Sequence, residues 1–509
     1  MTRLPVLNAA QAAEWDERAR TEARMPSRVL MEAAGRAVAQ VAAARFPEAV
    51  RRGVLVAAGH GNNGGDGWVA ARALRAVGVR VWVAEVDKAR SPDCDANRTL
   101  ALKDGVELLP PDTAWPLPGV TLDALLGTGA SGAPRGPIGE LAKRLAALPA
   151  PLVAVDGPTG LDLSTGAAHG PVRATLTVTF GGARRGHLLA REWSGTIVVA
   201  DIGFPPPDPA WPVLFDDRAA AARLPPIEPA MHKGDRGRVL VIGGADGMAG
   251  AALHAASAAL AAGAGLVRLA ASEPTVRAVQ ASLPDALTTR TALGPDVEQE
   301  LQEMLAWADA VVLGPGLGRG ELRTRFACAV LAGCRVPAVV DADALHTGDA
   351  FSAGRAPRVL TPHPGEFRSA FPDLADRLTA DRFAATQEAA ERSRATVLLK
   401  GVPTVIASAD APSAVVAAGN PGLATGGSGD LLAGFIGAFL ARGLAPPDAA
   451  ALGALTLGRA ADLAAPRTGV RSMRPADVIR ALPEVWRALA APPAPAPPVL
   501  LTLDPPWSA

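Results

Sequence analysis

Two series of short apolar runs, each alternating with longer helical periods, set the main limit on how this chain can fold. The first series has strand-like runs at residues 53–58, 79–84, 121–126, 152–155 and 175–180, with helical stretches such as 68–77 and 138–148 between them. The second has strand-like runs at 239–242, 310–313, 338–341 and 397–399, and ends in helical periods around 430–441, 447–464 and 475–490. Strands that alternate with helices form parallel sheets covered on both faces. We therefore predict an α/β fold for each half.

Proline-rich segments divide the chain. Residues 204–212 and 224–229 lack amide donors at many positions, which makes regular structure difficult there. The length of 509 residues also exceeds one ordinary domain of about 150 residues. We predict one domain over residues 1–225, a second over 226–490, and a loose proline-rich tail over 491–509.

Composition excludes several functions. The 50 Lys and Arg residues balance 50 Asp and Glu residues, so we expect neither a nucleic-acid nor a membrane partner. Because the chain has no Tyr, no mechanism can use a tyrosine as acid or nucleophile. Residues 247–267 lack charge but are rich in Ala and Gly, so they predict a buried helix rather than a membrane span. Three cysteines without a CxxC pair favour the cytoplasm.

A glycine-rich turn follows the first strand-like run, in the segment Gly59-His60-Gly61-Asn62-Asn63-Gly64-Gly65-Asp66-Gly67. A strand, a glycine turn and a helix start bring unpaired amides and the positive end of the helix dipole to one point, where a phosphate can bind. A tight connection without a ligand would need only the glycines. The two asparagines and the aspartate add oxygen ligands that such a turn does not require, so we interpret the segment as a binding site.

Two further acidic segments follow strands of the same predicted sheet. They read Asp123-Ala-Leu-Leu-Gly127-Thr128-Gly129 and Asp156-Gly-Pro-Thr159-Gly160. Ligands of open parallel sheets bind beyond the carboxyl ends of the strands, so Asn63, Asp123 and Asp156 should meet there. Each aspartate alone could cap a helix or turn. Together they predict a shared site.

These three segments, in this order and spacing, resemble the N-terminal half of the bifunctional NAD(P)H-hydrate repair enzymes, a Rossmann-like epimerase of the YjeF N-terminal type. The resemblance implies interconversion of the R and S hydrates of NADH and NADPH. It also implies a bound potassium ion with ligands at Asn63, Asp123 and Thr159, whose oxygen donors suit a hard cation. The implied hydrate contacts are Asn62, Asn63, Gly64, Gly65, Asp66, Gly127, Thr128, Gly129, Ala130, Ser131, Gly132, Ala133 and Asp156.

Epimerisation of such a hydrate concerns carbon 6, whose hydroxyl lies next to the ring nitrogen. Loss of hydroxide or ring opening can erase the configuration there, so an acid/base group beside that carbon suffices. We expect Asp123 in this role, with Lys88, which lies where the family often has a catalytic lysine. A solvated surface position is the alternative for Lys88. A binding module without catalysis is the alternative for the whole first half.

The second series ends in a denser glycine signal, Thr425-Gly426-Gly427-Ser428-Gly429-Asp430, directly before an apolar helical period. Successive amides at a helix start can form an anion hole, and a carboxylate at that start can act as a base. Aspartate is also favoured in a first helical turn for structural reasons alone. The density of glycines favours a site.

Upstream segments add a second resemblance. They are His232-Lys233-Gly234, Gly314 to Gly318, Asp341 to Leu345, Thr361-Pro-His363-Pro-Gly-Glu366-Phe and Leu399-Lys400-Gly401. In this order they resemble the ribokinase-like dehydratase half of the same family, which uses ADP in bacterial-type members or ATP in others. The implied hydrate contacts are Ala251, Gly316, Gly318, His363 and Asp430. The implied nucleotide contacts are Lys400, Gly401, Val402, Pro403, Thr404, Gly426, Gly427, Ser428 and Gly429.

The second resemblance implies a phosphorylation route to dehydration. Asp430 would assist attack of the hydrate hydroxyl on the terminal phosphoryl group of ADP, with Mg²⁺ bridging the phosphates. The expected partners are therefore NAD(P)H hydrates and ADP, and we expect a homo-oligomer. A kinase for a small alcohol, such as a hydroxymethylpyrimidine or a sugar, is the alternative, because the same helix start would serve it.

Overall fold

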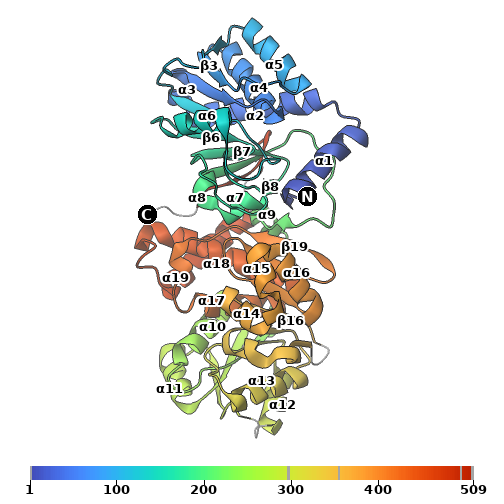
Figure 1. Ribbon diagram of the computed structural model, residues 1–509. Coiled ribbons are helices and arrows are strands. Elements are labelled where there is room, and N and C mark those ends of the chain that lie inside the picture. Colours follow the sequence, from blue (N-terminus) through green and yellow to red (C-terminus); the bar gives the residue numbers. More distant parts are fainter. Residues whose placement is uncertain (1–2, 295–297, 353–355, 493, 495, 506–509) are drawn as a thin grey trace. The chain divides into compact units, whose positions relative to one another are not determined.

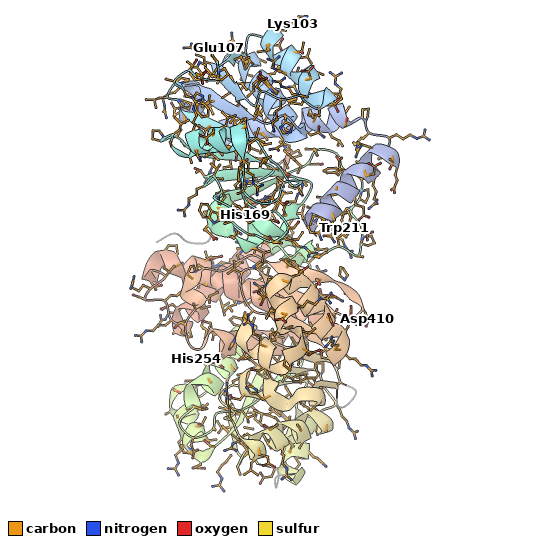
Figure 2. All side chains as sticks on the ribbon, viewed as in Figure 1. Lys103, Glu107, His169, Trp211, His254 and Asp410 are labelled. Atoms are coloured by element: carbon orange, nitrogen blue, oxygen red, sulfur yellow. The ribbon has the colours of Figure 1, made fainter. Side chains whose placement is uncertain are left out.

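The computed structural model describes residues 3–294, 298–352, 356–492, 494 and 496–505 (Figure 1), and Figure 2 adds their side chains. Contacts divide the chain into two compact units. One reaches Pro212 and takes in the C-terminal segment up to Pro505, and the other spans Val213–Pro492. Both units are α/β, with sheets in which parallel pairs predominate, so the predicted fold class is confirmed.

The described part of the first unit contains an eight-stranded sheet with the order β20-β9-β7-β6-β5-β2-β3-β4. Neighbouring strands are parallel except β20, which is antiparallel to β9. The strands are β2 (Val54–Ala58), β3 (Val81–Glu85), β4 (Glu107–Leu108), β5 (Val120–Ala124), β6 (Leu152–Val155), β7 (Leu176–Phe180), β9 (Thr196–Ala200) and β20 (Val499–Leu503). A separate parallel pair joins β1 (Val6–Leu7) to β8 (Ala183–Arg184).

Helices cover both faces of this sheet because successive side chains of each strand point to opposite faces. In β2, Val54 and Val56 lie in a core with α2 (Ser27–Arg45), α4 (Asn62–Ala76) and α5 (Pro92–Lys103). Ala57 lies in another core with α6 (Gly136–Ala146). The remaining helices of the unit are α1 (Ala9–Thr21), α3 (Pro47–Arg51), α7 (Arg185–Leu189) and α8 (Arg191–Ser194).

The second unit contains a ten-stranded sheet among its described residues, with the order β10-β19-β18-β17-β16-β15-β14-β11-β12-β13. Only the β17–β18 and β18–β19 pairs in this sheet are antiparallel. The strands are β10 (Val213–Leu214), β11 (Arg238–Ile242), β12 (Leu266–Ala271), β13 (Leu287–Arg290), β14 (Ala310–Leu313), β15 (Ala338–Val340), β16 (Arg358–Leu360), β17 (Thr396–Leu399), β18 (Thr404–Ser408) and β19 (Ala411–Val416).

Two helical layers enclose this second sheet. Val239 and Val241 of β11 share a core with α9 (Asp217–Ala221), α10 (Ala249–Ala261), α11 (Glu273–Ser282), α17 (Ser428–Ala441), α18 (Pro446–Thr468) and α19 (Pro475–Ala490). Leu240 and Ile242 share the opposite core with α12 (Glu298–Trp307), α13 (Glu321–Gly333), α14 (Pro364–Ala370), α15 (Ala375–Ala380) and α16 (Arg382–Ser393). The 3-10 segments are η1 (Ala342–Ser352), η2 (Pro372–Leu374) and η3 (Pro421–Leu423).

The structure differs from the sequence predictions at the domain ends. The first unit ends at Pro212 rather than at residue 225, because β10 starts directly after the first proline cluster and pairs with β19. The predicted loose tail is also wrong in part: residues 499–503 form β20, an edge strand whose apolar side chains are half-buried. Proline content hid this strand, since prolines flank it but do not interrupt it.

Two helix predictions meet different outcomes. The uncharged stretch around residue 255 is the buried helix α10, as expected, and no helix among the described residues is both long and apolar enough to cross a membrane. The helix predicted over 68–77 instead begins at Asn62. Residues 62–67 of the glycine-rich segment therefore form the first turns of α4, and only Gly59, His60 and Gly61 connect it to β2.

We expect truncation after Pro492 to loosen the first unit selectively. Without β20, the amides of β9 that face it lose their partners and exchange faster with solvent. Hydrogen exchange should therefore rise at residues 196–200, while β11 in the second unit serves as the internal control and keeps its protection. Equal protection of β9 in the truncated and full-length chains would contradict the pairing.

Candidate functional sites

The start of α4 brings the glycine-rich segment against the end of β2. A Cβ atom on Gly64 would lie 1.9 Å from the carbonyl oxygen of Gly59, and one on Gly65 would lie 2.5 Å from Sδ of Met31. Both glycines therefore allow close packing of strand and helices. Asn63 is different: its amide oxygen and nitrogen are buried and have no hydrogen-bond partner among the described residues.

Asp123 is a fully buried carboxylate at the end of β5. The Thr159 amide donates to its Oδ2 at 2.8 Å, and the Thr159 hydroxyl donates to its Oδ1 at 2.8 Å. The Leu125 amide adds a longer bond of 3.3 Å to Oδ1. Burial raises the pKa of Asp123 to about 6, against the lowering effect of these bonds. The structure thus brings together two of the three predicted potassium ligands, Asp123 and Thr159.

Asp156 begins the loop after β6 with a left-handed φ of 64°. The Thr128 amide donates to its Oδ2 at 2.9 Å, and the Thr128 hydroxyl makes a second bond to the same atom. The Arg184 guanidinium donates to Oδ1 at 3.1 Å. Burial alone would raise the pKa of Asp156, but Arg184 and Thr128 outweigh it and the pKa is lowered. Asp156 is therefore held as a carboxylate.

A cavity of about 1040 Å³ opens beside these loops. Of the predicted hydrate contacts, it is lined by Asn62, Asn63, Asp66, Gly127, Thr128, Gly129, Ala130 and Asp156. Asp123, Thr159 and Lys88 are not among its lining residues, and Lys88 is exposed to solvent. Ser131, Gly132 and Ala133 are likewise exposed and do not line it. The expected acid/base pair of Asp123 and Lys88 therefore does not face this cavity.

Asp66 and Asp156 are carboxyl groups of the cavity wall with opposite pKa shifts. Burial, helped by Asp156 and Asp16, raises the pKa of Asp66 well above its usual value. The pKa of Asp156 is lowered, as described above. Neighbouring carboxyls whose environments push their pKa values apart can act as an acid and a base.

Sequence reasoning missed Arg184 and His187. Besides Asp156, the Arg184 guanidinium bonds the Thr128 hydroxyl at 2.9 Å and the Gly182 carbonyl at 2.9 Å. Burial lowers the pKa of His187 to about 4, against the raising effect of Asp156. The signal was two adjacent arginines, one residue after the two glycines that follow β7, which place a cation at the same sheet edge as the predicted site.

In the second unit, Asp430 lies in the first turn of α17. Gly427 caps this helix with φ 96°, a left-handed conformation that favours glycine. The pKa of Asp430 is raised to about 6: burial is the largest cause and Asp341 adds to it, while Lys400 opposes it. A half-buried carboxyl at a helix start, next to a glycine turn, matches the predicted base and anion site.

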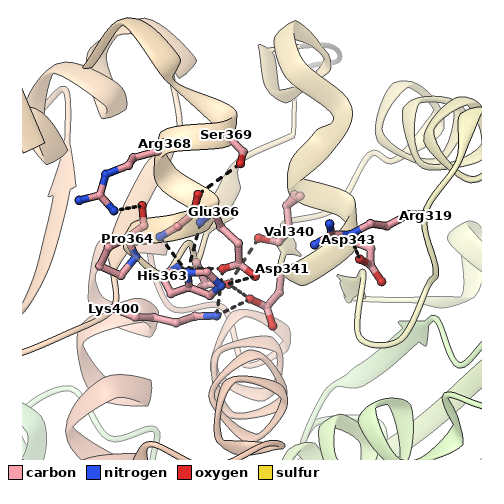
Figure 3. Close-up of polar contacts among 12 residues, drawn as sticks. Arg319, Val340, Asp341, Asp343, His363, Pro364, Glu366, Arg368, Ser369 and Lys400 are labelled. Carbon is pink, nitrogen blue, oxygen red and sulfur yellow. Dashed lines mark hydrogen bonds and ion pairs between the residues drawn. The ribbon is translucent and has the colours of Figure 1, made fainter. Parts of the chain in front are cut away.

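Figure 3 shows how Lys400 joins two acidic residues of this site. Its Nζ lies 2.7 Å from Oδ1 of Asp341 and 3.8 Å from Oε2 of Glu366. The Thr361 hydroxyl also donates to Oδ1 of Asp341, at 2.7 Å. Burial alone would lower the pKa of Lys400, but Asp341 and Glu366 outweigh it and the pKa is raised. Lys400 therefore stays an ammonium.

The other predicted contacts of the second site divide between packing and exposed positions. Gly316 has φ 61°, and a Cβ there would lie 3.2 Å from Cβ of Ala251, so the structure brings these two residues together. The Gly318 amide donates to Oδ2 of Asp343 at 3.0 Å. His363 caps α14: its Nδ1 accepts from the Gly365 amide at 2.9 Å. His363 thus has a structural role as the N-terminal cap of α14, and its contact with the hydrate stays a prediction.

Arg382 supports the predicted nucleotide loop, a residue that sequence reasoning missed. Its guanidinium donates to the carbonyls of Lys400 and Val402, each at 3.1 Å. Burial lowers the pKa of Arg382 to about 10. The Val402 side chain is 63% exposed, so the loop offers an apolar surface to solvent while Arg382 holds its backbone from behind.

Each unit thus combines a sheet dominated by parallel strands with amides and carboxylates at the carboxyl ends of those strands. This architecture is that of α/β proteins that bind phosphorylated ligands. A family model described as YjeF-related protein N-terminus matches residues 27–186, and one described as NAD(P)H-hydrate dehydratase matches residues 239–484. The chain belongs to the family of bifunctional NAD(P)H-hydrate repair enzymes, as two curated relatives show.

The relative from Escherichia coli K12, a bifunctional NAD(P)H-hydrate repair enzyme, is 37% identical over 469 residues, which cover 90% of this chain and 89% of that protein. The enzyme of the same name from Moorella thermoacetica is 37% identical over 521 residues, covering 95% and 97%. A solved ADP/ATP-dependent NAD(P)H-hydrate dehydratase from Bacillus subtilis, co-crystallised with ATP and Mg²⁺, is 29% identical with a TM-score of 0.49, covering 54% of this chain and 98% of that one. The family predicted from the motifs is confirmed, and the small-alcohol kinase is not favoured.

We expect Gly64→Ala to destabilise the first unit through a steric clash and Gly61→Ala, the control, to leave its stability unchanged. The added Cβ at residue 64 would meet the Gly59 carbonyl, whereas none of the surrounding atoms lies within 4 Å of one at residue 61. Overpacking costs about 1–3 kcal/mol. Thermal unfolding of the first unit should therefore shift down for Gly64→Ala and stay near wild type for Gly61→Ala. Similar melting of both variants would contradict the close approach.

Proposed function

We propose that this chain repairs hydrated NADH and NADPH in two consecutive steps. The first unit epimerises the R and S hydrates, and the second dehydrates the S hydrate at the expense of ADP, giving AMP and phosphate. The observation that carries the proposal is the order of the two family matches, each falling on a unit with a site at the carboxyl ends of its strands. The cytoplasm and a homo-oligomer remain predictions from the sequence.

In the first step, an acid and a base act at carbon 6 of the hydrate. We assign the acid to Asp66, whose pKa is raised well above its usual value, and the base to Asp156, whose pKa is lowered. Protonation of the hydroxyl by Asp66 lets it leave as water while the ring nitrogen supplies electrons to carbon 6. Water then adds from either face, with its proton passing to a carboxylate of the wall. This assignment replaces Asp123, because that carboxylate does not line the cavity.

We propose that Asn63, Asp123 and Thr159 hold the potassium ion. Two observations support these donors: the Asn63 amide is buried without a partner among the described residues, and no cationic side chain contributes to the pKa of Asp123. When bound, the ion would supply positive charge beside the Asp123 carboxylate. Thr159 still bonds the Leu126 amide at 3.2 Å, so these donors also fix the loop that carries Gly127 and Thr128.

Asp66→Asn tests the first step. We expect epimerisation to fall by about 10²–10⁴-fold, the usual contribution of a general acid, because the amide cannot protonate the leaving hydroxyl. Unfolding should change little, since the neutral amide has nearly the same shape and burial already disfavours the ionised form of the carboxyl. The R-to-S rate is measured against the spontaneous background.

Asp123→Asn is the matched comparison for that experiment. It should raise the potassium concentration needed for half-maximal epimerisation, because one anionic ligand is lost. If Asp66→Asn keeps the wild-type rate while Asp123→Asn abolishes epimerisation at saturating potassium, the original assignment to Asp123 stands instead.

In the second step, Asp430 accepts the proton of the hydrate hydroxyl as that oxygen attacks the terminal phosphoryl group of ADP. The Gly426–Gly429 amides stabilise the transferring charge, and AMP leaves. Mg²⁺, when bound, would neutralise charge on the phosphates. The original bond between carbon 6 and the phosphorylated oxygen then breaks with electrons from the ring nitrogen, so that phosphate leaves, and a proton leaves the neighbouring carbon to restore NAD(P)H.

Asp430→Asn tests this second step. Dehydration should fall by about 10²–10⁴-fold while epimerisation by the first unit continues. In the wild type, the rate should drop as pH falls through about 6, because a base works only when ionised and the pKa of Asp430 is raised to about 6. A mixture of R and S hydrates with ADP and Mg²⁺, followed by NADH absorbance and free phosphate, reads both steps. A stable phosphorylated product would instead indicate a kinase.

A further inference from the structure

Asp341 is the most deeply placed charge near the second site. Its side chain is 2% exposed, and its Oδ1 receives both the Lys400 ammonium and the Thr361 hydroxyl at 2.7 Å. A carboxylate so enclosed is occupied by its protein partners. The role of Asp341 therefore lies in its ion pair with the Lys400 ammonium (Figure 3).

The ammonium that Asp341 holds lies against the glycine turn. A Cβ on Gly429 would lie 3.2 Å from Nζ of Lys400 and 3.9 Å from Oδ2 of Asp341. Gly429 directly precedes Asp430, so the Asp341–Lys400 pair lies behind the first turn of α17. Glu366 on α14 bounds the ammonium from the other side, at 3.8 Å.

We propose that Asp341 is a positioning residue that fixes the Lys400 ammonium behind the Gly426–Gly429 turn and, through this pair, sets the charge state of Asp430. The proposal rests on the proposed function of Asp430 as the base. Lys400, which the family resemblance implied as a nucleotide contact, thereby gains a second role. Without Asp341 the ammonium would lose its 2.7 Å ion pair and be free to move toward the Asp430 carboxylate, which would favour the ionised form of Asp430.

The charged groups around Asp430 come from several elements and act in opposite directions. Asp341 after β15, Glu366 on α14 and Asp343 in η1 disfavour its ionised form, and the Lys400 ammonium after β17 favours it. His254 of α10 lies beside Gly427, and burial lowers its pKa, which favours the uncharged imidazole. The balance therefore depends on the pair Asp341 and Lys400.

The proposal predicts that Asp341→Asn and Lys400→Met shift the pH profile of dehydration in opposite directions. kcat/KM for ADP-dependent dehydration of the S hydrate is measured against pH with the full chain, because this ratio reports groups of the free enzyme. Asp341→Asn removes a carboxylate that disfavours ionisation of Asp430. The acid limb of the profile, where the rate falls as Asp430 is protonated, should therefore move to lower pH. Lys400→Met removes the cation, so the limb should move to higher pH. Each shift should be about one pH unit.

Asp309→Asn is the matched control. Asp309 pairs with Arg238 at 3.0 Å at the start of β11, and the amino ends of parallel strands lie at the sheet edge away from the site. This variant removes an ion-paired aspartate from the same sheet and should leave the acid limb in place. Circular dichroism checks that each variant is folded, and a charge-conserving rescue variant, Lys400→Arg, should return the limb toward the wild type.

The outcomes separate the two proposals. If the wild type shows no ADP-dependent dehydration, or Asp430→Asn retains it, the proposed function of Asp430 fails. If those experiments behave as expected but the limbs of folded Asp341→Asn and Lys400→Met stay in place or move the same way, the positioning role fails alone. Loss of rate without movement of either limb would assign the pair a structural role and overturn the proposal.

Discussion

A buried aspartate at the end of one strand, bonded to a threonine after the neighbouring strand, organises both sites. In the first unit, Asp123 lies near the end of β5 and accepts a hydrogen bond from Thr159, which lies beyond β6. In the second unit, Asp341 directly follows β15 and accepts a hydrogen bond from Thr361, which lies beyond β16. Burying a carboxylate is costly unless hydrogen bonds satisfy it. Each pair therefore ties two adjacent loops together at the edge where ligands bind.

The two units compensate the buried charge differently. Lys400 lies 2.7 Å from Asp341, whereas the pKa of Asp123, with only hydrogen bonds to favour its ionised form, is raised to about 6. The Lys400 ammonium compensates the charge of Asp341 in the second unit, whereas a cation from solution suits Asp123 in the first unit. This contrast explains why an ion is proposed for the first site, where Asn63 also has buried polar atoms without a partner.

Much of the fold followed from the sequence because strands buried on both faces are continuous apolar runs. β6 and β14 were predicted to the residue, and α19 likewise. β20 was missed because its partner β9 is about 300 residues away, and local pattern carries no information on such pairing.

The sites, like the fold, could be predicted from the sequence only where neighbouring residues define them. Motifs located the loops, since glycine and aspartate after a strand mark a binding edge. They did not show which carboxylates face the cavity. That depends on side-chain direction and on residues far along the chain, such as Arg184, whose bond to Asp156 joins elements 28 residues apart.

Electrostatics at the first cavity connects the zero net charge of the chain to its proposed substrate. A hydrate of NADH or NADPH carries phosphates, and an ionised Asp66 beside an ionised Asp156 would oppose such a ligand. Burial disfavours the ionised form of Asp66, and Arg184 offsets the charge of Asp156, so both carboxyl groups oppose an anionic ligand less, without a basic surface. Amides at the start of α4 then suffice to attract an anion. The raised pKa of Asp66 would thus serve both the binding of an anionic hydrate and the proton transfer of the proposed first step.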